Sequence, residues 1–85
     1  MIKAVVWGTG HIAGRFMRLR VYNNHVYEIA SFVDNDRSKH GKPFYGMEII
    51  SPAEIANIDY EVIIVCVGKP DPIINQLVHD MGISP

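Results

Sequence analysis

Hydrophobic side chains along this chain form two kinds of segment, short apolar runs and longer stretches with a helical period. Residues 2–7, 29–33 and 62–67 are short and mainly apolar, and each run is followed directly by glycine or aspartate. Such runs are typical of strands that are covered on both faces of a parallel sheet. A polar loop over residues 38–43 precedes a further brief strand at 47–50. The pattern therefore predicts four strands.

Two segments have the spacing of an amphipathic helix. Ile12, Phe16 and Leu19 recur at intervals of four and three, which predicts a helix of about three turns that ends at residues 22–25. Apolar side chains recur again over residues 71–82, a stretch that opens on Asp-Pro and closes on glycine. These end signals predict a last helix.

A capping box marks the start of a third, shorter helix. Ser51 suits the N-cap, Pro52 suits the first helical position, and Glu54 follows the serine by three residues. We expect this helix to extend to about Asn57. The element order is then strand, helix, strand, strand, helix, strand, helix. That order predicts one α/β domain with three layers, a mostly parallel sheet and helices on both faces. In the usual doubly wound arrangement the strand order is 3-2-1-4.

Three glycines and an alanine follow the first predicted strand in the stretch VVWGTGHIAG, and GTGHIA has the G-x-G-x-x-[G/A] spacing. Gly8 lets the chain turn off the strand, and Gly10 leaves room for a pyrophosphate beside the N–H groups that open the helix. Ala13 and Gly14 allow that helix to pack closely on the sheet. Asp34 ends the second strand, where a carboxylate can accept hydrogen bonds from a ribose. Together these features predict a Rossmann-like dinucleotide-binding domain.

The same aspartate bears on which dinucleotide binds. Asp34 would repel a 2′-phosphate and accept a hydrogen bond from a free 2′-hydroxyl, which favours NAD over NADP. Arg37 follows in the polar loop and is placed to neutralise such a phosphate, so NADP stays open. No lysine follows the glycines as a P-loop requires, so ATP hydrolysis is not indicated.

The segments VVWGTGHIAGRFMRL, IASFVDNDRSKHGKPFYGMEIISPAEI and YEVIIVCVG resemble the nucleotide-binding Rossmann domains of polysaccharide-biosynthesis enzymes. These enzymes include capsular nucleotide-sugar dehydratases and epimerases and related sugar-modifying transferases. The GTGHIA turn is also similar to the glucose-fructose oxidoreductase family, whose N-terminal half binds a nicotinamide dinucleotide. That family usually has a proline after its fourth strand, whereas this chain has VCVGKPDPII there. Both resemblances imply one site, with Gly8, Thr9, Gly10, His11 and Ile12 around the phosphates, Asp34 and Asn35 at the ribose, and Val67 and Gly68 near the adenine or nicotinamide.

Composition limits the partners and the compartment. The net charge of −1 argues against a general nucleic-acid binder, although residues 1–27 contain one lysine, three arginines and no acid. An anionic small ligand near the glycines fits this excess, and a solvated helix face explains the arginines equally well. The longest apolar run, residues 62–67, is too short to span a membrane. The N-terminus lacks the features of a signal peptide, so we expect a cytoplasmic protein without a membrane partner.

No catalytic residue and no metal site are indicated by the sequence. None of the four tyrosines has a lysine four residues later, and the four histidines share no ligand spacing with one another or with Cys66. Cys66 lies in an apolar run and is expected to be a buried, inert thiol. His11 and Arg15 lie where they could contact a phosphate, and a solvated surface position is the plain alternative for each.

Two classes of function therefore fit the sequence. One is the cofactor-binding part of an oxidoreductase, dehydratase or epimerase acting on a nucleotide-linked sugar, with its catalytic groups outside residues 1–85. The other is a non-catalytic module that holds a nucleotide or nucleotide-sugar for an attached transferase. A methyl-donor site is weaker, because no acid precedes the glycines in AVVWG. The strand at 62–67 falls at a sheet edge, yet it is apolar on both faces and uncharged. We expect it to be covered by a further domain of the same chain or by a second copy in a homodimer.

Overall fold

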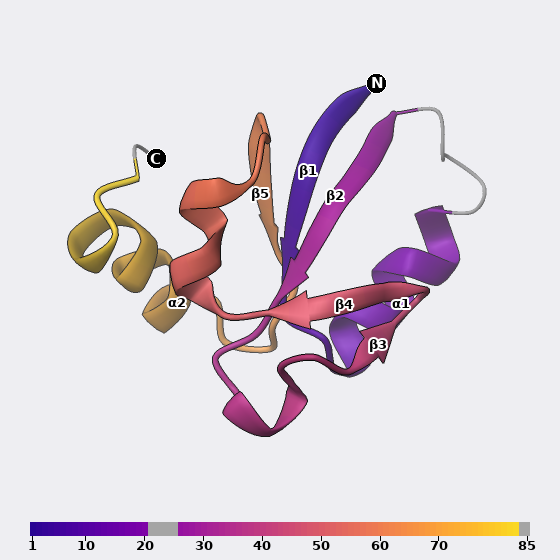
Figure 1. The fold of residues 1–85 in the computed structure, drawn as a ribbon, viewed down its shortest axis with the longest axis horizontal. Coiled ribbons are helices and arrows are strands. Elements are labelled where there is room, and N and C mark those ends of the chain that lie inside the picture. Colours follow the sequence, from indigo (N-terminus) through magenta and orange to yellow (C-terminus); the bar gives the residue numbers. More distant parts are fainter. Residues whose placement is uncertain (21–25, 84–85) are drawn as a thin grey trace.

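The chain forms one twisted sheet with helical segments on both faces, and the computed structural model describes residues 1–20 and 26–83. The strands are β1 (Ile2–Trp7), β2 (Tyr27–Val33), β3 (Pro43–Phe44), β4 (Met47–Ile50) and β5 (Val62–Val65). They lie in the order β3-β4-β2-β1-β5 (Figure 1). β1 pairs in parallel with β2 and β5, and β2 pairs in parallel with β4. For the four predicted strands this confirms the mostly parallel sheet and the order 3-2-1-4.

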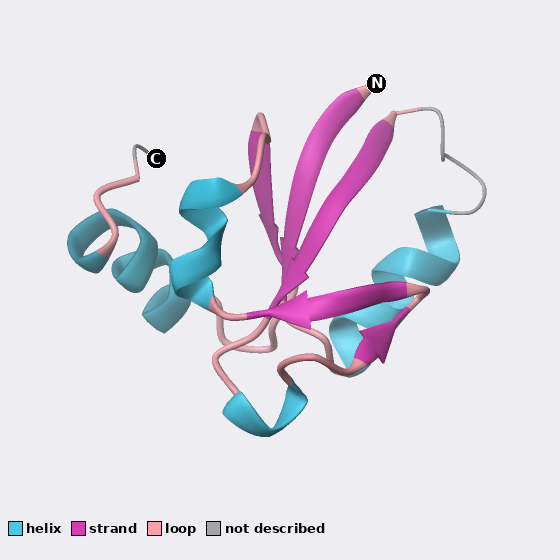
Figure 2. Ribbon diagram, viewed as in Figure 1, coloured by secondary structure: helices cyan, strands magenta, loops and turns pink. Residues whose placement is uncertain are grey.

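Helical segments connect the strands and cover the sheet (Figure 2). They are α1 (His11–Arg20), the 3-10 turns η1 (Arg37–Lys39) and η2 (Pro52–Asn57), α2 (Asp71–Asn75) and the π-helical turn η3 (Gln76–Asp80). The first predicted helix is confirmed from its start to Arg20, and its predicted end at 22–25 lies outside the described residues. No helix within the described ranges is long and apolar enough to cross a membrane.

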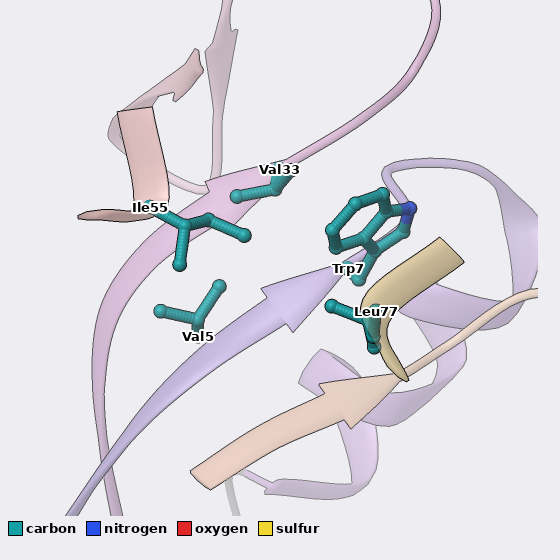
Figure 3. Packing of buried hydrophobic residues seen from close by; sticks show 5 residues of the cluster. All are labelled: Val5, Trp7, Val33, Ile55 and Leu77. Carbon is teal, nitrogen blue, oxygen red and sulfur yellow. The ribbon is translucent and has the colours of Figure 1, made fainter. Parts of the chain in front are cut away.

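The central strand β1 is buried on both faces, because consecutive side chains of a strand point in opposite directions. Val6 packs with Phe32 of β2 and with Ala13 of α1, and all three side chains are completely buried. On the opposite face, β1 and β2 meet the turns η2 and η3 in a second cluster (Figure 3), which consists of Val5, Trp7, Val33, Ile55 and Leu77. Helical segments thus cover both faces of the sheet, as a three-layer fold requires.

Two strand boundaries differ from the prediction. β2 begins at Tyr27, two residues before the predicted start at 29, and β5 ends at Val65 rather than at residue 67. The N–H of Cys66 still donates to the carbonyl of Trp7 at 2.8 Å. The chain then turns away from the ladder toward Gly68. Residues 66–68 therefore form a loop at the carboxyl end of β5.

The later helices are shorter and less regular than predicted. The segment opened by the capping box is a 3-10 turn, in which the Glu54 carboxylate accepts a hydrogen bond from the N–H of Ser51 at 3.1 Å. The last helix is α-helical only from Asp71 to Asn75 and continues as a π-helical turn. In that turn the N–H of Met81 donates to the carbonyl of Gln76, which lies five residues earlier.

A hairpin that the sequence did not predict joins β3 to β4. Its two-residue turn has positive φ at both positions, +48° at Tyr45 and +82° at Gly46. This is the arrangement of a type I′ turn, which usually carries Asn-Gly or Gly-Gly. The Tyr45 ring packs edge-on against Phe44, with 4.9 Å between centroids, and its hydroxyl donates to the carbonyl of Gly14 at 3.4 Å. This hydrogen bond connects the hairpin to α1.

Candidate functional site

The glycine loop lies at the carboxyl end of β1, and Gly8 is its most constrained residue. Gly8 has φ +112°, and its N–H donates to the carbonyl of Val33 at 2.7 Å. A Cβ at Gly8 would collide with the backbone carbonyl of Cys66. Only glycine combines this φ with this close approach. The sharp turn predicted at Gly8 is therefore present.

Gly10 has the opposite environment. A Cβ there would meet no atom within 4 Å, because the residue faces open space. The N–H of Gly14 donates to the carbonyl of Gly10, so α1 begins directly after this residue. The first N–H groups of a helix have no acceptor within the helix, and the first turn of α1 contains no acid. An anion placed over Gly10 would meet these donors and the positive end of the helix dipole.

A cleft of about 250 Å³ opens at this point between the carboxyl ends of β1, β2 and β5. Its walls are Gly8, Thr9, Gly10, His11, Ile12, Asp34, Lys39, Cys66, Val67 and Gly68. The fold thus brings together eight of the nine predicted binding residues, from three segments that are distant in sequence. Asn35 is absent from the walls, whereas Lys39 and Cys66 are additions that the sequence analysis did not include.

Asp34 ties the end of β2 to the glycine loop. Its Oδ2 accepts hydrogen bonds from the N–H of Thr9 at 3.1 Å and from the Thr9 hydroxyl at 2.7 Å. Its Oδ1 accepts from the N–H of Asp36 at 2.9 Å. The Lys39 ammonium lies 3.7 Å from Oδ2. The carboxylate therefore fixes the position of Thr9 above the cleft.

The ionisation of Asp34 reflects two opposed effects. Partial burial disfavours the charged form, since the side chain is only 17% exposed. The hydrogen bonds from Thr9 and Asp36 and the nearby charge of Lys39 favour it and outweigh burial, so the pKa of Asp34 is lowered. The cleft thus holds a stable carboxylate beside an ammonium group.

Lys39 reaches the cleft because the loop after β2 is folded into a tight turn. The Asp36 carboxylate accepts hydrogen bonds from the N–H of Ser38 at 3.0 Å and from its hydroxyl at 2.7 Å, which caps η1. A ring nitrogen of His40 lies 2.6 Å from the carbonyl of Asp34 and folds the loop back on itself. The sequence contained the Asp-x-Ser signal for this turn, but it gave no indication that the turn points Lys39 into the cleft.

The Asn35 side chain contacts the last helical segment. Its amide and that of Gln76 form a reciprocal pair, with the Asn35 Nδ2 2.9 Å from Oε1 and the Gln76 Nε2 3.1 Å from Oδ1. This pair connects the end of β2 to η3. In this structure Asn35 therefore holds the last helical segment against the sheet.

The remaining candidate groups are His11, Arg15 and Cys66. His11 is exposed and lines the cleft, whereas Arg15 is exposed and lies outside its walls. Cys66 is a free, buried thiol whose pKa is raised by burial, as expected for an inert cysteine. Within the described part of the chain, no three His, Cys, Asp or Glu side chains lie close enough to hold a metal ion.

The same fold occurs in crystal structures of RSP, a Rex-family repressor. One RSP structure matches with a TM-score of 0.73 at 11% identity, over 98% of this chain and 42% of the RSP chain. RSP in complex with β-NADH matches with a TM-score of 0.72 at 11% identity, over 98% and 42% of the two chains. RSP in complex with β-NAD+ and operator DNA matches with a TM-score of 0.72 at 13% identity, over 98% and 41%. The predicted Rossmann-like fold is confirmed, and this chain spans less than half of the RSP chain.

In sequence, none of the curated proteins is significantly similar to this chain. The family model described as C2185-like, N-terminal matches residues 1–85. The chain therefore belongs to the C2185-like N-terminal domain family.

Proposed function

We propose that this domain binds a dinucleotide, NAD(H), with its pyrophosphate over Gly10 at the start of α1. The observation that carries the proposal is the contrast between the two glycines of the loop. Gly8 is required by the backbone, whereas Gly10 faces open space beside the first N–H groups of a helix. Packing of the fold gives no reason for a glycine at that position, and close approach of a phosphate does.

The rest of the cleft suits the remainder of the ligand. Asp34 lies at the end of β2, where the adenosine ribose of a dinucleotide would be bound, and Asn35 adjoins it. His11 and Ile12 follow Gly10 and would flank the phosphates, and Val67 and Gly68, which also line the cleft, would lie near a base. Support also comes from RSP, which has the same fold and whose structures include complexes with β-NADH and β-NAD+.

We propose that any catalytic groups lie outside residues 1–85. The Asp34 carboxylate accepts hydrogen bonds from Thr9 of the glycine loop, and the thiol of Cys66 is buried. We propose that residues 1–85 supply the cofactor site of a larger unit, and the resemblance to polysaccharide-biosynthesis enzymes makes a nucleotide-linked sugar its substrate class. The second candidate is a non-catalytic module that binds a nucleotide or nucleotide-sugar for an attached transferase, and a binding role without chemistry is favoured by the likeness to RSP, a repressor.

Titration calorimetry tests the binding function directly. The chain is titrated with NADH, NAD+, ADP and a UDP-sugar under identical conditions. We expect NADH and NAD+ to bind and ADP to bind more weakly, because ADP retains the diphosphate but lacks the second nucleoside. Binding of the UDP-sugar alone would favour a nucleotide-sugar module, and no heat with any of the four would refute the proposed function.

A further inference from the structure

The part of the cleft beside Asp34 contains a hydrogen-bond network and a lysine that the sequence analysis did not include. Two bonds from Thr9 occupy Oδ2 of Asp34, and a bond from Asp36 occupies Oδ1. A carboxylate has about four acceptor positions, so room remains for about one further donor. A ribose that donated both hydroxyls to this carboxylate would displace part of the network that holds the glycine loop.

Lys39 is the lysine that lines the cleft at this point. Its side chain is 37% exposed, and its ammonium lies 3.7 Å from Oδ2 of Asp34. The backbone of Lys39 is fixed, since its N–H donates to the carbonyl of Asp36 and its carbonyl accepts from Lys42, both at 3.0 Å. A fixed backbone with a flexible four-carbon side chain lets the ammonium move from the carboxylate to a ligand at small cost.

Around this part of the cleft, negatively and positively charged side chains are equal in number. Residues 34–40 contain two acids, Asp34 and Asp36, and two permanent cations, Arg37 and Lys39. Asp36 is fully exposed, so solvent screens its effect on a ligand. The repulsion of a 2′-phosphate by Asp34 is thus opposed by a cation that lines the same wall.

We infer that Lys39 is a specificity-determining residue that admits the 2′-phosphate of NADP(H), so that the domain binds NADPH at least as tightly as NADH. The preference for NAD was expected from the Asp34 carboxylate alone. The ammonium of Lys39 lies beside that carboxylate and offsets its charge. The inference rests on the proposed function, because it concerns the adenosine end of the same dinucleotide site. A phosphate monoester carries about 1.5 to 2 negative charges at pH 7, and it gains more from an ammonium than a hydroxyl does.

The test compares NADH and NADPH on the wild-type chain and on Lys39→Met, Lys39→Arg and Lys42→Met. Methionine keeps an unbranched side chain, one heavy atom shorter than that of lysine, and removes the charge. We expect Lys39→Met to weaken NADPH about tenfold or more and to change NADH by less than about threefold. Lys39→Arg should retain NADPH binding, because the charge is kept. Lys42→Met removes an exposed lysine of the same loop that does not line the cleft, and it should change neither affinity.

The outcomes separate this inference from the proposed function. Tighter binding of NADH than of NADPH to the wild-type chain, or equal losses of both in Lys39→Met, would overturn the role of Lys39 and leave dinucleotide binding in place. Failure of both dinucleotides to bind the wild-type chain would refute the proposed function together with the inference. Titration with 2′,5′-ADP and AMP isolates the 2′-phosphate, and a preference for 2′,5′-ADP that disappears in Lys39→Met would support the inference.

Discussion

At the scale of single residues, we expect the two glycines of the GTG turn to have different roles, Gly8 in folding and Gly10 in binding. Gly10→Val should leave the fold intact, because its Cβ points into open space, and should abolish NADH binding, because the branched side chain occupies the phosphate position. Circular dichroism checks the fold and titration calorimetry checks the affinity. Ala56→Val is the matched control, since it adds the same side chain at an exposed position outside the cleft. Unchanged NADH affinity in Gly10→Val would contradict the proposed site.

Gly8 should respond in the opposite way. Gly8→Ala places a Cβ against the carbonyl of Cys66 and forces a side chain into φ +112°. We expect it to lower the free energy of unfolding by about 1 to 3 kcal/mol, measured by urea denaturation. A Gly8→Ala chain as stable as the wild type would show that the backbone relaxes at this turn.

Because of Asp34, the stability of the fold should depend on pH in the acid range. Its pKa is lowered in the folded chain, so its contribution to stability is complete above the unfolded pKa of about 4 and is lost as the pH falls through the folded pKa. Asp34→Asn should therefore be less stable at pH 7 and should lose less further stability on acidification than the wild type. Denaturation curves measured between pH 7 and pH 2 test this, and parallel pH profiles for the two chains would contradict it.

The contact with Thr9 provides an independent measurement. Thr9→Val removes the hydroxyl that donates to Asp34 at 2.7 Å, so the pKa of Asp34 should rise, as followed by carboxyl NMR. Thr9→Ser keeps a hydroxyl donor and should leave that pKa low. A pKa that is the same in both variants would show that the hydroxyl bond does not contribute.

At the scale of elements, the turn η2 illustrates a local signal that determines local structure. The Glu54 side chain satisfies the N–H of Ser51, and η2 places Ile55 in the core. Glu54→Ala should lower the free energy of unfolding by about 0.5 to 2 kcal/mol. Glu54→Gln keeps an acceptor oxygen and should be close to the wild type. Equal urea midpoints for Glu54→Ala and the wild type would show that the cap contributes nothing.

At the scale of the whole molecule, β5 is the last strand of the sheet, and among the described residues no strand pairs with its outer side, where an apolar groove lies. The groove has a volume of about 480 Å³, and its walls include Ile63 and Val65 of β5 and Ile74 and Leu77 of the last helical segments. β5 itself contains no charged residue and no proline, although Glu61 directly before it lines the groove. We propose that further protein covers it, from the same chain or from a second copy.

The isolated chain should therefore associate as its concentration rises, as sedimentation velocity would detect. Ile74 is 43% exposed and lines the groove, so Ile74→Lys should reduce association without unfolding the domain. Leu19 is 63% exposed on α1, outside the walls of the groove, and Leu19→Lys should leave association unchanged. A wild-type chain that stays monomeric at high concentration would contradict this proposal.

Local chemistry in the sequence determined most of the fold. The apolar runs specified three of the four parallel strands, the glycine spacing specified the turn at Gly8, and the apolar period specified α1, because each signal acts over a few neighbouring residues. The alternation of strands with helical segments then indicated a parallel sheet, since parallel strands need crossover connections, and the glycine spacing favoured the Rossmann-like order 3-2-1-4 among the possible orders.

Tertiary structure decided what depends on contacts between distant residues. The β3–β4 hairpin carries Tyr45 at positive φ because the Phe44 ring and the Gly14 carbonyl hold it there, and no local preference of tyrosine indicates such a turn. Asn35 pairs with Gln76, 41 residues away, whereas Lys39 enters the cleft. The sequence placed Tyr45, Asn35 and Lys39 in loops, and it placed Gln76 in the last predicted helix. Which loop side chain faces a ligand was decided by packing between segments, because a loop has no periodicity from which a direction can be read.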